Sequence, residues 1–272
     1  MYELITDKTF DLKNTIEYKL SIQVSLGGFS FSVVNPEENR LLALKNSPLK
    51  ISNETFIARR FSEWIESEEI LQQKFGEMQI IVSTKNFTTV PEDFYLTENS
   101  KKLTGLFWET DKDTKIIENK IDPFKLHLLF AVPNQLASSI QSSFDNCSFL
   151  HPVKKICEQT PDFISENGVI LLFDANSFYI IVFNKNNFLM ANSFNITSAN
   201  DILYYVLTSI KQLEIDAGKT QLFFAGQLFQ KEETENKLKD YFKSVKLLNP
   251  GSSLKFNPEF FNQPLYQYIS IL

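Results

Sequence analysis

Few side chains in this sequence could take part in chemistry, and the best candidate is Asp174. It stands at the end of an apolar run and is followed by Ala175-Asn176-Ser177. A carboxylate at a strand end can hold a hard cation such as Mg²⁺, which prefers anionic oxygen ligands. The same pattern is typical of an Asx-type turn, in which the side chain only bonds to its own backbone. Both interpretations stay open for this residue.

A second candidate is the Gly27-Gly28 pair, which also follows a strand-like segment. Glycines allow the backbone to approach a ligand closely, and they equally form plain hairpin turns. A third stretch, residues 216–220 (Asp-Ala-Gly-Lys-Thr), resembles the end of a nucleotide-binding P-loop. It fails that motif because Leu213 occupies the upstream glycine position, and the segment connects a helix to a strand instead of a strand to a helix.

The other reactive residues indicate structural roles. Two cysteines, Cys147 and Cys157, are too few for a disulfide scaffold and lack zinc-ligand spacing. His127 and His151 lie in or beside apolar segments, with no carboxylate or cysteine at ligand spacing. No Ser-His-Asp, Cys-His or paired-carboxylate arrangement stands out. We therefore expect no catalytic residue.

Charge and composition exclude other classes of function. The net charge is −6, the pI is about 5.2, and arginine occurs only as Arg40, Arg59 and Arg60. Nucleic-acid binding needs a basic surface, so no nucleic acid is expected as a partner. No apolar run reaches about 18 residues, and the N-terminus has no secretory signal pattern. We expect a cytoplasmic protein without a transmembrane segment.

The elements that would position these residues occur twice in the same order. Alternating apolar and polar residues predict a β-hairpin, a third strand, a capped helix and a short buried strand, and the set returns roughly 150 residues later. With 272 residues, the chain is long enough for two cores. We therefore predict an α/β protein with an internal duplication, divided into residues 1–125 and 126–272. The first set covers residues 18–34, 40–44, 52–71 and 77–82; the second covers strands 168–173, 178–183 and 188–194, a helix capped by Thr197 or Ser198, and strand 222–225.

The remaining segments are less regular. Residues 91–122 are polar and predict an irregular insertion with a short helix over 103–108. The tail, residues 260–272, is apolar and contains no lysine or arginine, so we expect it to pack against the body or a partner instead of a membrane. Other expected elements are strands 126–132, 147–150 and 245–248 and helices 133–144, 152–158 and 232–242.

This duplicated unit resembles the actin-like ATPase fold, a ribonuclease H-like architecture of two lobes around a cleft. The resemblance is strongest to its cell-division and pilus-assembly branch, the FtsA- and PilM-like proteins. In that branch the helix of the second lobe follows a Gly-Gly-Asp-Ile-like step, which residues 198–202 (Ser-Ala-Asn-Asp-Ile) resemble. The chain also looks like a small uncharacterised Bacteroidetes family with this fold. The resemblance covers residues 18 to about 250 and rests on element order more than on motifs.

The resemblance implies that the turn after the first strand of each lobe holds a phosphate. In the first turn, Ser25 stands where active members carry the aspartate that organises magnesium. In the second turn the aspartate is kept, and Asn176 stands where glycine usually allows a positive φ. A third, glycine-rich loop contacts adenosine in the family and is reduced to one glycine here. The cofactor-binding residues implied by resemblance are Gly27, Gly28, Asp174, Asn176 and Gly226, with Asp174 as the metal ligand.

The architecture is kept while all three loops are weakened. We therefore expect a pseudoenzyme: a non-catalytic, bacterial, cytoplasmic protein-binding or scaffold module with an unidentified protein partner and no cofactor. The alternative is an ATP-binding protein or slow ATPase that holds ATP and magnesium in the cleft. A small-molecule kinase is a third hypothesis, for which no catalytic base can be named. Aromatic plugging of the cleft by Phe29 or Phe178 would exclude a phosphate.

Overall fold

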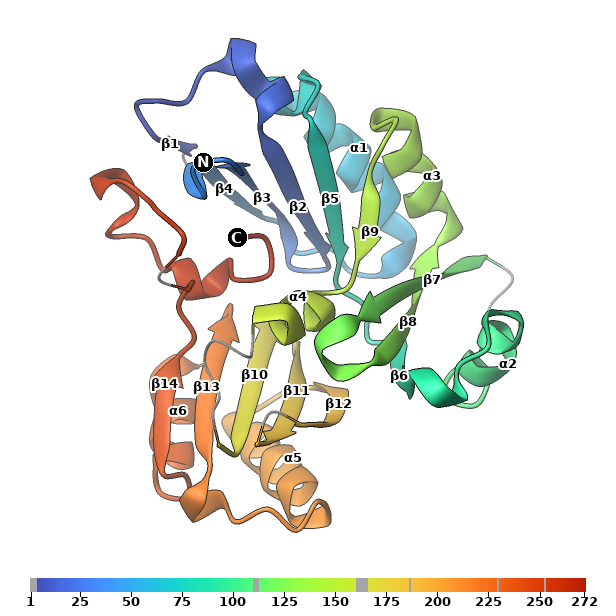
Figure 1. The fold of residues 1–272 in the computed structure, drawn as a ribbon, viewed down its shortest axis with the longest axis vertical. Helices are drawn as coiled ribbons and strands as arrows, with labels where there is room; N and C mark the ends of the chain where they lie inside the picture. The colour runs from blue at the N-terminus through green and yellow to red at the C-terminus, as the bar shows by residue number, and fades with distance from the viewer. Residues whose placement is uncertain (1–3, 110–112, 160–165, 186, 229, 252) are drawn as a thin grey trace.

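The computed structural model describes residues 4–109, 113–159, 166–185, 187–228, 230–251 and 253–272. Its strands form two large sheets, one above the other in Figure 1, and a smaller third sheet on the right. The fold is mixed α/β, as predicted. We call the part built on the upper sheet the first lobe and the part built on the lower sheet the second lobe.

The first sheet has the strand order β1-β4-β3-β2-β5-β9. Strand β2 pairs antiparallel with β3, so the predicted hairpin is present, and it pairs parallel with β5. Successive side chains of a strand point to opposite faces. Leu20, Ile22 and Val24 thus pack in one cluster with helices α1 (Ile57–Ser67) and α3 (Asn134–Ser143). The strands are β1 (Ile5–Thr6), β2 (Lys19–Ser25), β3 (Gly28–Asn35), β4 (Arg40–Pro48), β5 (Glu77–Val82) and β9 (Ser148–Leu150).

The helix predicted over residues 52–71 is divided into three pieces. Asn53 caps the first, a 3-10 turn over Glu54–Phe56, by accepting a hydrogen bond from the Thr55 amide. Helix α1 then ends at Ser67, because Glu68 adopts an extended conformation (φ −111°, ψ 104°). The Glu68 carboxylate reaches Lys45 of β4 at 2.7 Å, so a tertiary ion pair accompanies the break. The predicted end near Leu71 is therefore wrong, and a second 3-10 turn, Glu69–Gln72, follows.

The second sheet has the order β12-β11-β10-β13-β14. Strand β10 pairs antiparallel with β11 and parallel with β13, which is the connectivity of β2 in the first sheet. Ser198 caps the following helix: its hydroxyl accepts from the Asp201 amide, and Asp201 accepts from the Ser198 amide. Whether the two halves arose by duplication stays a prediction. The elements are β10 (Gly168–Asp174), β11 (Ser177–Asn184), β12 (Asn187–Asn195), α5 (Ala199–Gln212), β13 (Gln221–Gly226), α6 (Lys231–Lys239) and β14 (Ser244–Leu247).

The insertion predicted to be irregular contributes one strand, β7, to a third, antiparallel sheet with the order β6-β8-β7. Its strands are β6 (Phe87–Pro91), β7 (Thr114–Ile121) and β8 (Leu126–Pro133). Strand β7 escapes sequence reasoning because most of its side chains are polar or half-exposed, and only Asn119 and Ile121 are buried. The short helix α2 spans Ser100–Thr104, so the prediction of a helix over residues 103–108 is wrong.

The chain returns to the first lobe after β14. Residues 253–272, which we call the C-terminal strap, run beside the face of the first sheet opposite α1 (Figure 1). Phe260, Leu265, Ile269 and Ile271 are buried there, in contact with residues of β3, β4 and β5. The predicted tail thus packs against the body. Helix α4 (Pro152–Gln159) also contributes to the joint between the lobes (Figure 1).

The structure connects the two predicted halves extensively. Strand β9 follows residue 126 in sequence, yet it pairs with β5 of the first sheet. Strands β7 and β8 pair across the proposed boundary. The division into residues 1–125 and 126–272 therefore stays a prediction about independently stable units. Among the described residues, no helix is long and apolar enough to cross a membrane.

Candidate functional site

The two predicted loops lie against each other at the junction of the lobes. Gly27 in the β2–β3 turn faces Ala175 in the β10–β11 turn, and a Cβ added at Gly27 would lie 3.3 Å from the Ala175 Cβ. A cavity of about 490 Å³ opens beside this contact. Gly27, Asp174 and Asn176 line it, together with residues 48–52 and 83–85. The structure therefore brings three of the five predicted site residues to one cavity.

The first turn is closed by its own lobe. The Ser25 hydroxyl accepts from the Gly27 amide at 3.0 Å. The carbonyl oxygens of Leu26 and Gly27 accept from the amides of Ile51 and Leu49, at 2.9 and 3.0 Å. These bonds hold the segment after β4 over the turn. The acceptor groups of the turn thus already have protein partners.

Gly28 has a structural reason to be glycine. Its φ is +126°, a conformation that other residues rarely adopt, and an added Cβ would overlap the Ser47 carbonyl oxygen and the Leu49 amide nitrogen. Because this requirement comes from the approach of β4, it holds whether or not a ligand binds. Gly28 does not line the cavity.

The second turn differs from the expectation at one position. The positive φ, 48°, belongs to Ala175, so the proposal that Asn176 takes this conformation is wrong. Asn176 is exposed, and its carbonyl accepts from the Ile196 amide at 2.7 Å. The Ser177 hydroxyl donates to the Asp174 carbonyl at 3.1 Å. An alanine in a left-handed conformation lowers stability by about 1 kcal/mol, and the surrounding hydrogen bonds hold it in this conformation.

Asp174 is the titratable group of this site. Removal from water raises the pKa of its carboxyl to about 6, while the polar side chains of Ser25 and Ser83 oppose the shift. The side chain is therefore ionised only in part at mildly acidic pH. Shifted carboxylates in cavities are typical of functional sites, although structural networks produce them too.

Gly226 lies beside the second turn but outside the cavity. It ends β13 opposite Phe173, has a φ of +77°, and an added Cβ would overlap the Phe173 carbonyl oxygen. That carbonyl accepts from the Gln227 amide at 3.2 Å. The glycine is thus required by the close approach of two strands. The structure does not bring it together with Gly27 and Asp174 around one cavity.

The aromatic plug considered from the sequence is absent from the cavity wall. Phe29 packs against Phe61 and Trp64 in the first lobe, with ring centroids 5.7 and 5.1 Å apart. Phe178 packs against Phe173 and Phe194 in the second lobe. Neither lines the cavity, where the turn–turn contact and the segment after β4 instead limit the space.

A group of contacts that sequence reasoning missed fixes the lobes to each other, centred on Thr84 between β5 and β6. The Thr84 carbonyl accepts from the Tyr179 hydroxyl at 3.1 Å and lies 3.0 Å from His151 Nε2. Next to it, Lys85 donates to the Asn195 side chain at 2.8 Å and accepts at its carbonyl from Ser193. We call these residues the interlobe latch. No sequence motif marks them, because each bond joins segments far apart in the chain.

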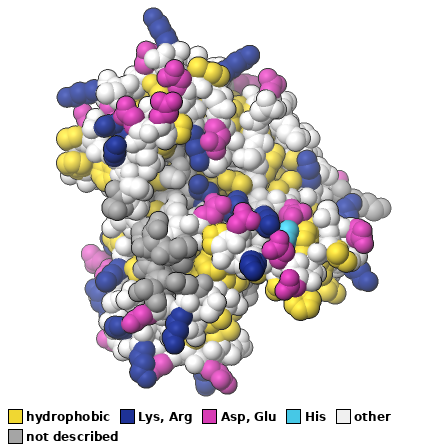
Figure 2. Space-filling model, in the orientation of Figure 1, with side chains coloured by type: hydrophobic (Ala, Val, Ile, Leu, Met, Phe, Trp, Pro, Cys, Tyr) yellow, Lys and Arg dark blue, Asp and Glu magenta, His cyan; other side chains and the backbone are white. Residues whose placement is uncertain are grey.

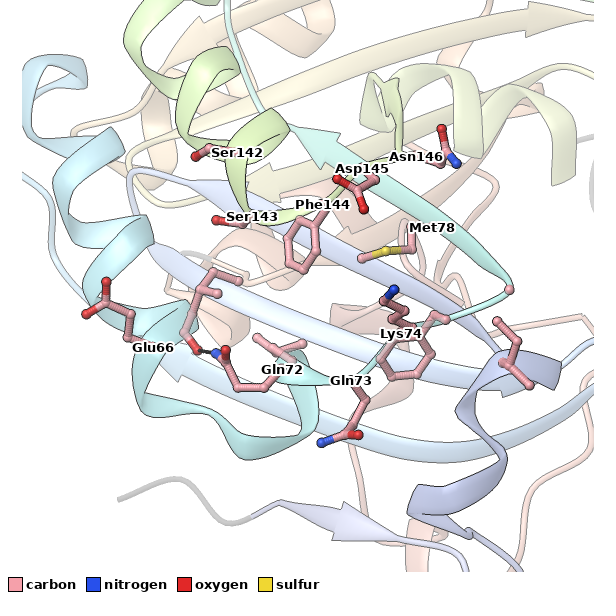
Figure 3. A pocket seen from close by; sticks show the side chains of 15 residues that line it. Glu66, Gln72, Gln73, Lys74, Met78, Ser142, Ser143, Phe144, Asp145 and Asn146 are labelled. Atoms are coloured by element: carbon pink, nitrogen blue, oxygen red, sulfur yellow. Dashed lines mark hydrogen bonds between the residues drawn. The ribbon is translucent and has the colours of Figure 1, made fainter.

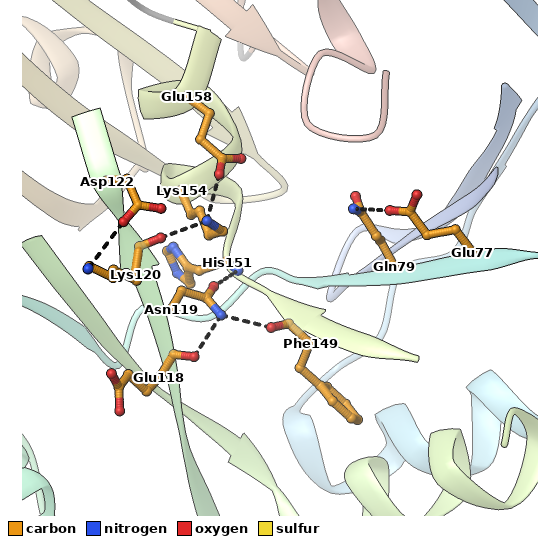
Figure 4. Close-up of polar contacts among 10 residues, drawn as sticks. All are labelled: Glu77, Gln79, Glu118, Asn119, Lys120, Asp122, Phe149, His151, Lys154 and Glu158. Atoms are coloured by element: carbon orange, nitrogen blue, oxygen red, sulfur yellow. Dashed lines mark hydrogen bonds and ion pairs between the residues drawn. The ribbon is translucent and has the colours of Figure 1, made fainter. Parts of the chain in front are cut away.

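His151 and Asn119 extend the latch (Figure 4). Burial lowers the pKa of His151 to about 3, so the ring is neutral, with Nε2–H donating to Thr84 and Nδ1 accepting from the Val153 amide. The Asn119 side chain donates to the Phe149 carbonyl at 2.9 Å and accepts from the His151 amide at 2.9 Å. Both residues thus hold β7, β9 and α4 together.

Two carboxylates, Asp174 and Glu54, line the cavity, and the sequence singled out Asp174 as a candidate metal ligand. Within the described ranges, no group of three or more histidine, cysteine, aspartate or glutamate side chains could hold a metal ion. Both cysteines are free, and burial raises the pKa of each thiol. The assignment of Asp174 to a metal stays a prediction.

A larger cavity, of about 670 Å³, lies at the far end of the first lobe (Figure 3). It opens between the 3-10 turn that follows α1 and the end of α3, with Gln72, Gln73 and Lys74 on one side and Ser142 and Ser143 on the other. Sequence reasoning did not single out this groove. Its wall mixes amides, hydroxyls and buried apolar side chains and does not bring together the residues predicted from the sequence.

A family model described as "Protein of unknown function (DUF3822)" matches residues 7–245. The chain belongs to this family. No curated protein matches the sequence. The family assignment carries no activity with it, because its own description leaves the function open.

Solved structures confirm the actin-like ATPase fold. A Bacteroides thetaiotaomicron protein with actin-like ATPase fold and unknown function superposes with a TM-score of 0.80 at 20% identity, over 93% of this chain and 97% of that one. The PilM–PilN type IV pilus biogenesis complex gives a TM-score of 0.59 at 8% identity, over 94% and 96%. The ethanolamine utilization protein EutJ from Carboxydothermus hydrogenoformans gives 0.54 at 8% identity, over 98% and 92%. At these identities the likeness concerns the fold alone.

Proposed function

We propose that this DUF3822 protein is a non-catalytic member of the actin-like fold and acts as a cytoplasmic protein-binding or scaffold module. The observation that carries the proposal is the contact between the two turns. Gly27 and Ala175 face each other so closely that a Cβ added at Gly27 would lie 3.3 Å from the Ala175 Cβ, at the place that the resemblance assigns to a phosphate. A phosphate group could enter between the turns only if the lobes moved apart.

The residues around the turns fit a magnesium-bound triphosphate poorly. Ser25 offers a hydroxyl where magnesium would need an anionic oxygen, and that hydroxyl already accepts from the Gly27 amide. Burial raises the pKa of the Asp174 carboxyl, which indicates a site that does not favour extra negative charge. Gly28 and Gly226 are explained by strand packing without any ligand.

The interlobe latch supports the same proposal. Nucleotide hydrolases commonly open and close around the substrate during turnover. Here Tyr179 and His151 converge on the Thr84 carbonyl, and Lys85 bonds to Asn195. A scaffold that presents a fixed surface benefits from such a joint, whereas an opening cleft would have to break it.

One observation favours the alternative, an ATP-binding protein or slow ATPase. The 490 Å³ cavity is lined by Asp174 and by two lysines, Lys50 and Lys85. Lysine ammonium groups could neutralise phosphates, and Asp174 could hold magnesium through water. This alternative needs Lys85 to leave Asn195 and the first turn to release its covering segment.

Calorimetric titration with ATP and ADP in the presence of magnesium separates the two functions. We expect no heat of binding at millimolar nucleotide for wild type, Asp174→Ala and a control, Asp240→Ala, whose carboxylate is exposed at the end of α6. Micromolar binding that is lost in Asp174→Ala and kept in Asp240→Ala would refute the non-catalytic function.

A further inference from the structure

An exposed apolar patch lies on the segment between β6 and β7. Its members are Phe94, Leu96, Leu106 and Phe107, with exposed fractions of 77%, 56%, 75% and 64%. We call these four residues the outer patch. Figure 2 shows hydrophobic side chains gathered at the lower right of the molecule, around the third sheet and α2. Large apolar side chains exposed in a group, and not singly, are typical of interaction sites.

The fold holds this patch outward. Between Phe94 and Leu96, the Tyr95 ring stacks on His127 with centroids 4.1 Å apart, and its hydroxyl donates to the Glu118 carboxylate at 2.6 Å. Thr104 is fully buried just before Leu106, and its hydroxyl donates to the Lys101 carbonyl. Anchored neighbours therefore fix where the apolar side chains point, and the surface exists before any partner arrives.

The size of the outer patch matches one side of a protein interface. From their exposed fractions, the four side chains present roughly 500 Å² of apolar surface to water. One side of a standard interface buries about 800 Å², of which about 56–65% is apolar. The outer patch could therefore supply nearly all the apolar area that one subunit needs.

The charges around the patch complement each other. Asp93 and Glu98 lie on one part of the segment, and Lys101 and Lys102 lie on α2; all four are exposed. None of them belongs to an ion pair in the described part of the chain, where the nearby Glu92 pairs instead with Lys120. A two-fold interface is self-complementary, so the lysines of one copy can pair with the acids of the other across it.

We infer that the outer patch is the interface of a two-fold dimer of this chain. Phe94, Leu96, Leu106 and Phe107 form its apolar centre, and the flanking acids and lysines pair between subunits at the rim. This inference goes beyond the proposed function and does not depend on it, because the patch lies outside the interlobe cavity. A result on nucleotide binding would not affect the inference of a dimer.

Sedimentation velocity over a concentration series tests the interface. We expect wild type to be dimeric at about 100 µM, since standard-size interfaces reach micromolar affinity or better. Phe94→Ser combined with Leu106→Ser should raise the dissociation constant at least about tenfold, as loss of apolar anchors does. Phe261→Ser removes an equally exposed phenylalanine, 65% exposed on the C-terminal strap, and should leave the dimer unchanged.

A charge exchange keeps the test informative if the apolar variant folds poorly. Lys101→Glu with Lys102→Glu in one protein, and Asp93→Lys with Glu98→Lys in another, should each weaken self-association. Mixing the two proteins should restore a dimer, because the glutamates introduced in one protein then face the lysines introduced in the other. Circular dichroism confirms that each protein is folded.

Three outcomes would overturn the inference. Wild type could remain a monomer at about 100 µM, the range in which a standard-size interface assembles. The outer-patch variant could dimerise as tightly as Phe261→Ser. The mixed charge variants could fail to associate, which would assign the patch to a different protein.

Discussion

The two hairpin turns at the lobe junction occupy equivalent places and are built in opposite ways. The first, between Ser25 and Gly28, bonds to its own lobe and contains a glycine that strand packing requires. The second, between Asp174 and Ser177, contains a strained alanine and a carboxylate with a raised pKa. The first turn is thus constrained by packing, and the second carries a titratable group.

This difference shows that a residue at a motif position can be explained by packing and not by a ligand. Gly28 and Gly226 match positions of nucleotide loops, yet both are explained by backbone contacts that exist without a nucleotide. Packing alone can preserve a glycine after its ligand is gone. Asp174 has no such packing reason, so its role most needs a functional test.

The largest expected effect separates the two glycines of the first turn. Gly28→Ala should lower the free energy of unfolding by about 3 kcal/mol or more, because its φ is +126° and a Cβ would overlap the backbone of Ser47 and Leu49. Gly27→Ala should cost under about 1 kcal/mol, since its Cβ would meet only Ala175 and Ser25, at 3.3 and 3.4 Å. Urea denaturation measures both. Equal losses would show that the first turn is not constrained as described.

The second-largest effect on stability is expected from a substitution that makes the first turn resemble the second. Ser25→Asp places a buried carboxylate beside Asp174 and should lower stability by about 2–3 kcal/mol at pH 8, because like charges repel where water is excluded. Ser25→Asn adds the same bulk without charge and serves as the control. Two carboxylates can hold a divalent cation, so millimolar magnesium should recover part of the loss in Ser25→Asp alone. Thermal melts with and without magnesium give the answer; equal melting of both variants would contradict the proximity of Ser25 and Asp174.

Asp174→Asn should stabilise the protein at neutral and alkaline pH. The pKa of Asp174 is about 6 when folded against 3.8 in its unperturbed state, so the folded form binds the proton more tightly. Wild type therefore loses stability from this group as pH rises from 3.8 through 6. At about 1.4 kcal/mol per pKa unit, the variant should gain about 2–3 kcal/mol at pH 8 and almost nothing at pH 4.

Urea midpoints of wild type and Asp174→Asn across that pH range measure the effect. A gain that does not change with pH would mean that the carboxylate is not the cause. A loss at pH 8 would mean that the ionised form is stabilised by partners beyond Ser25 and Ser83.

The smallest expected effect concerns the second turn. Ala175→Gly should raise stability by about 0.5 kcal/mol, because relief of the left-handed conformation slightly exceeds the entropy lost by adding a glycine. The same substitution removes the side chain that faces Gly27. Differential scanning calorimetry resolves such a change. A clear loss of stability would mean that the turn–turn contact matters more than the strain.

Sequence reasoning captured the regular parts of the fold for a physical reason. Strands with one apolar face, such as β2 and β10, and helices with good caps, such as α5 after Ser198, encode their structure within a few residues. The resemblance to the actin-like fold, and not a local pattern, grouped Gly27, Asp174 and Asn176, and the structure places these three at one cavity. Local patterns were enough to find the elements, whereas the facing of the two turns was implied by the resemblance.

The rest depends on partners that are distant in sequence. Strand β7 is polar because most of its side chains are at least partly exposed and its buried Asn119 bonds to β9. Helix α1 ends just before Glu68, which forms an ion pair with the distant Lys45. The interlobe latch joins segments about 70 to 110 residues apart. The sequence suggested that Asn176 takes the positive φ of the second turn. The hairpin instead requires it one residue earlier, at Ala175, where it causes strain.

The C-terminal strap has a consequence for biosynthesis. Ser32 bonds to the carbonyl of Ile271, 239 residues later, and Gln23 bonds to Ser270, 247 residues later. A ribosome adds roughly 5–20 residues per second, so one face of the first sheet stays uncovered for roughly 10–50 seconds until the C-terminal strap is synthesised. During translation that face is bare, with buried serines such as Ser21 and Ser30 directed to it. The same face carries the apolar Val34, Leu41 and Leu44, so these side chains also stay uncovered during the delay, and such transient apolar exposure favours aggregation.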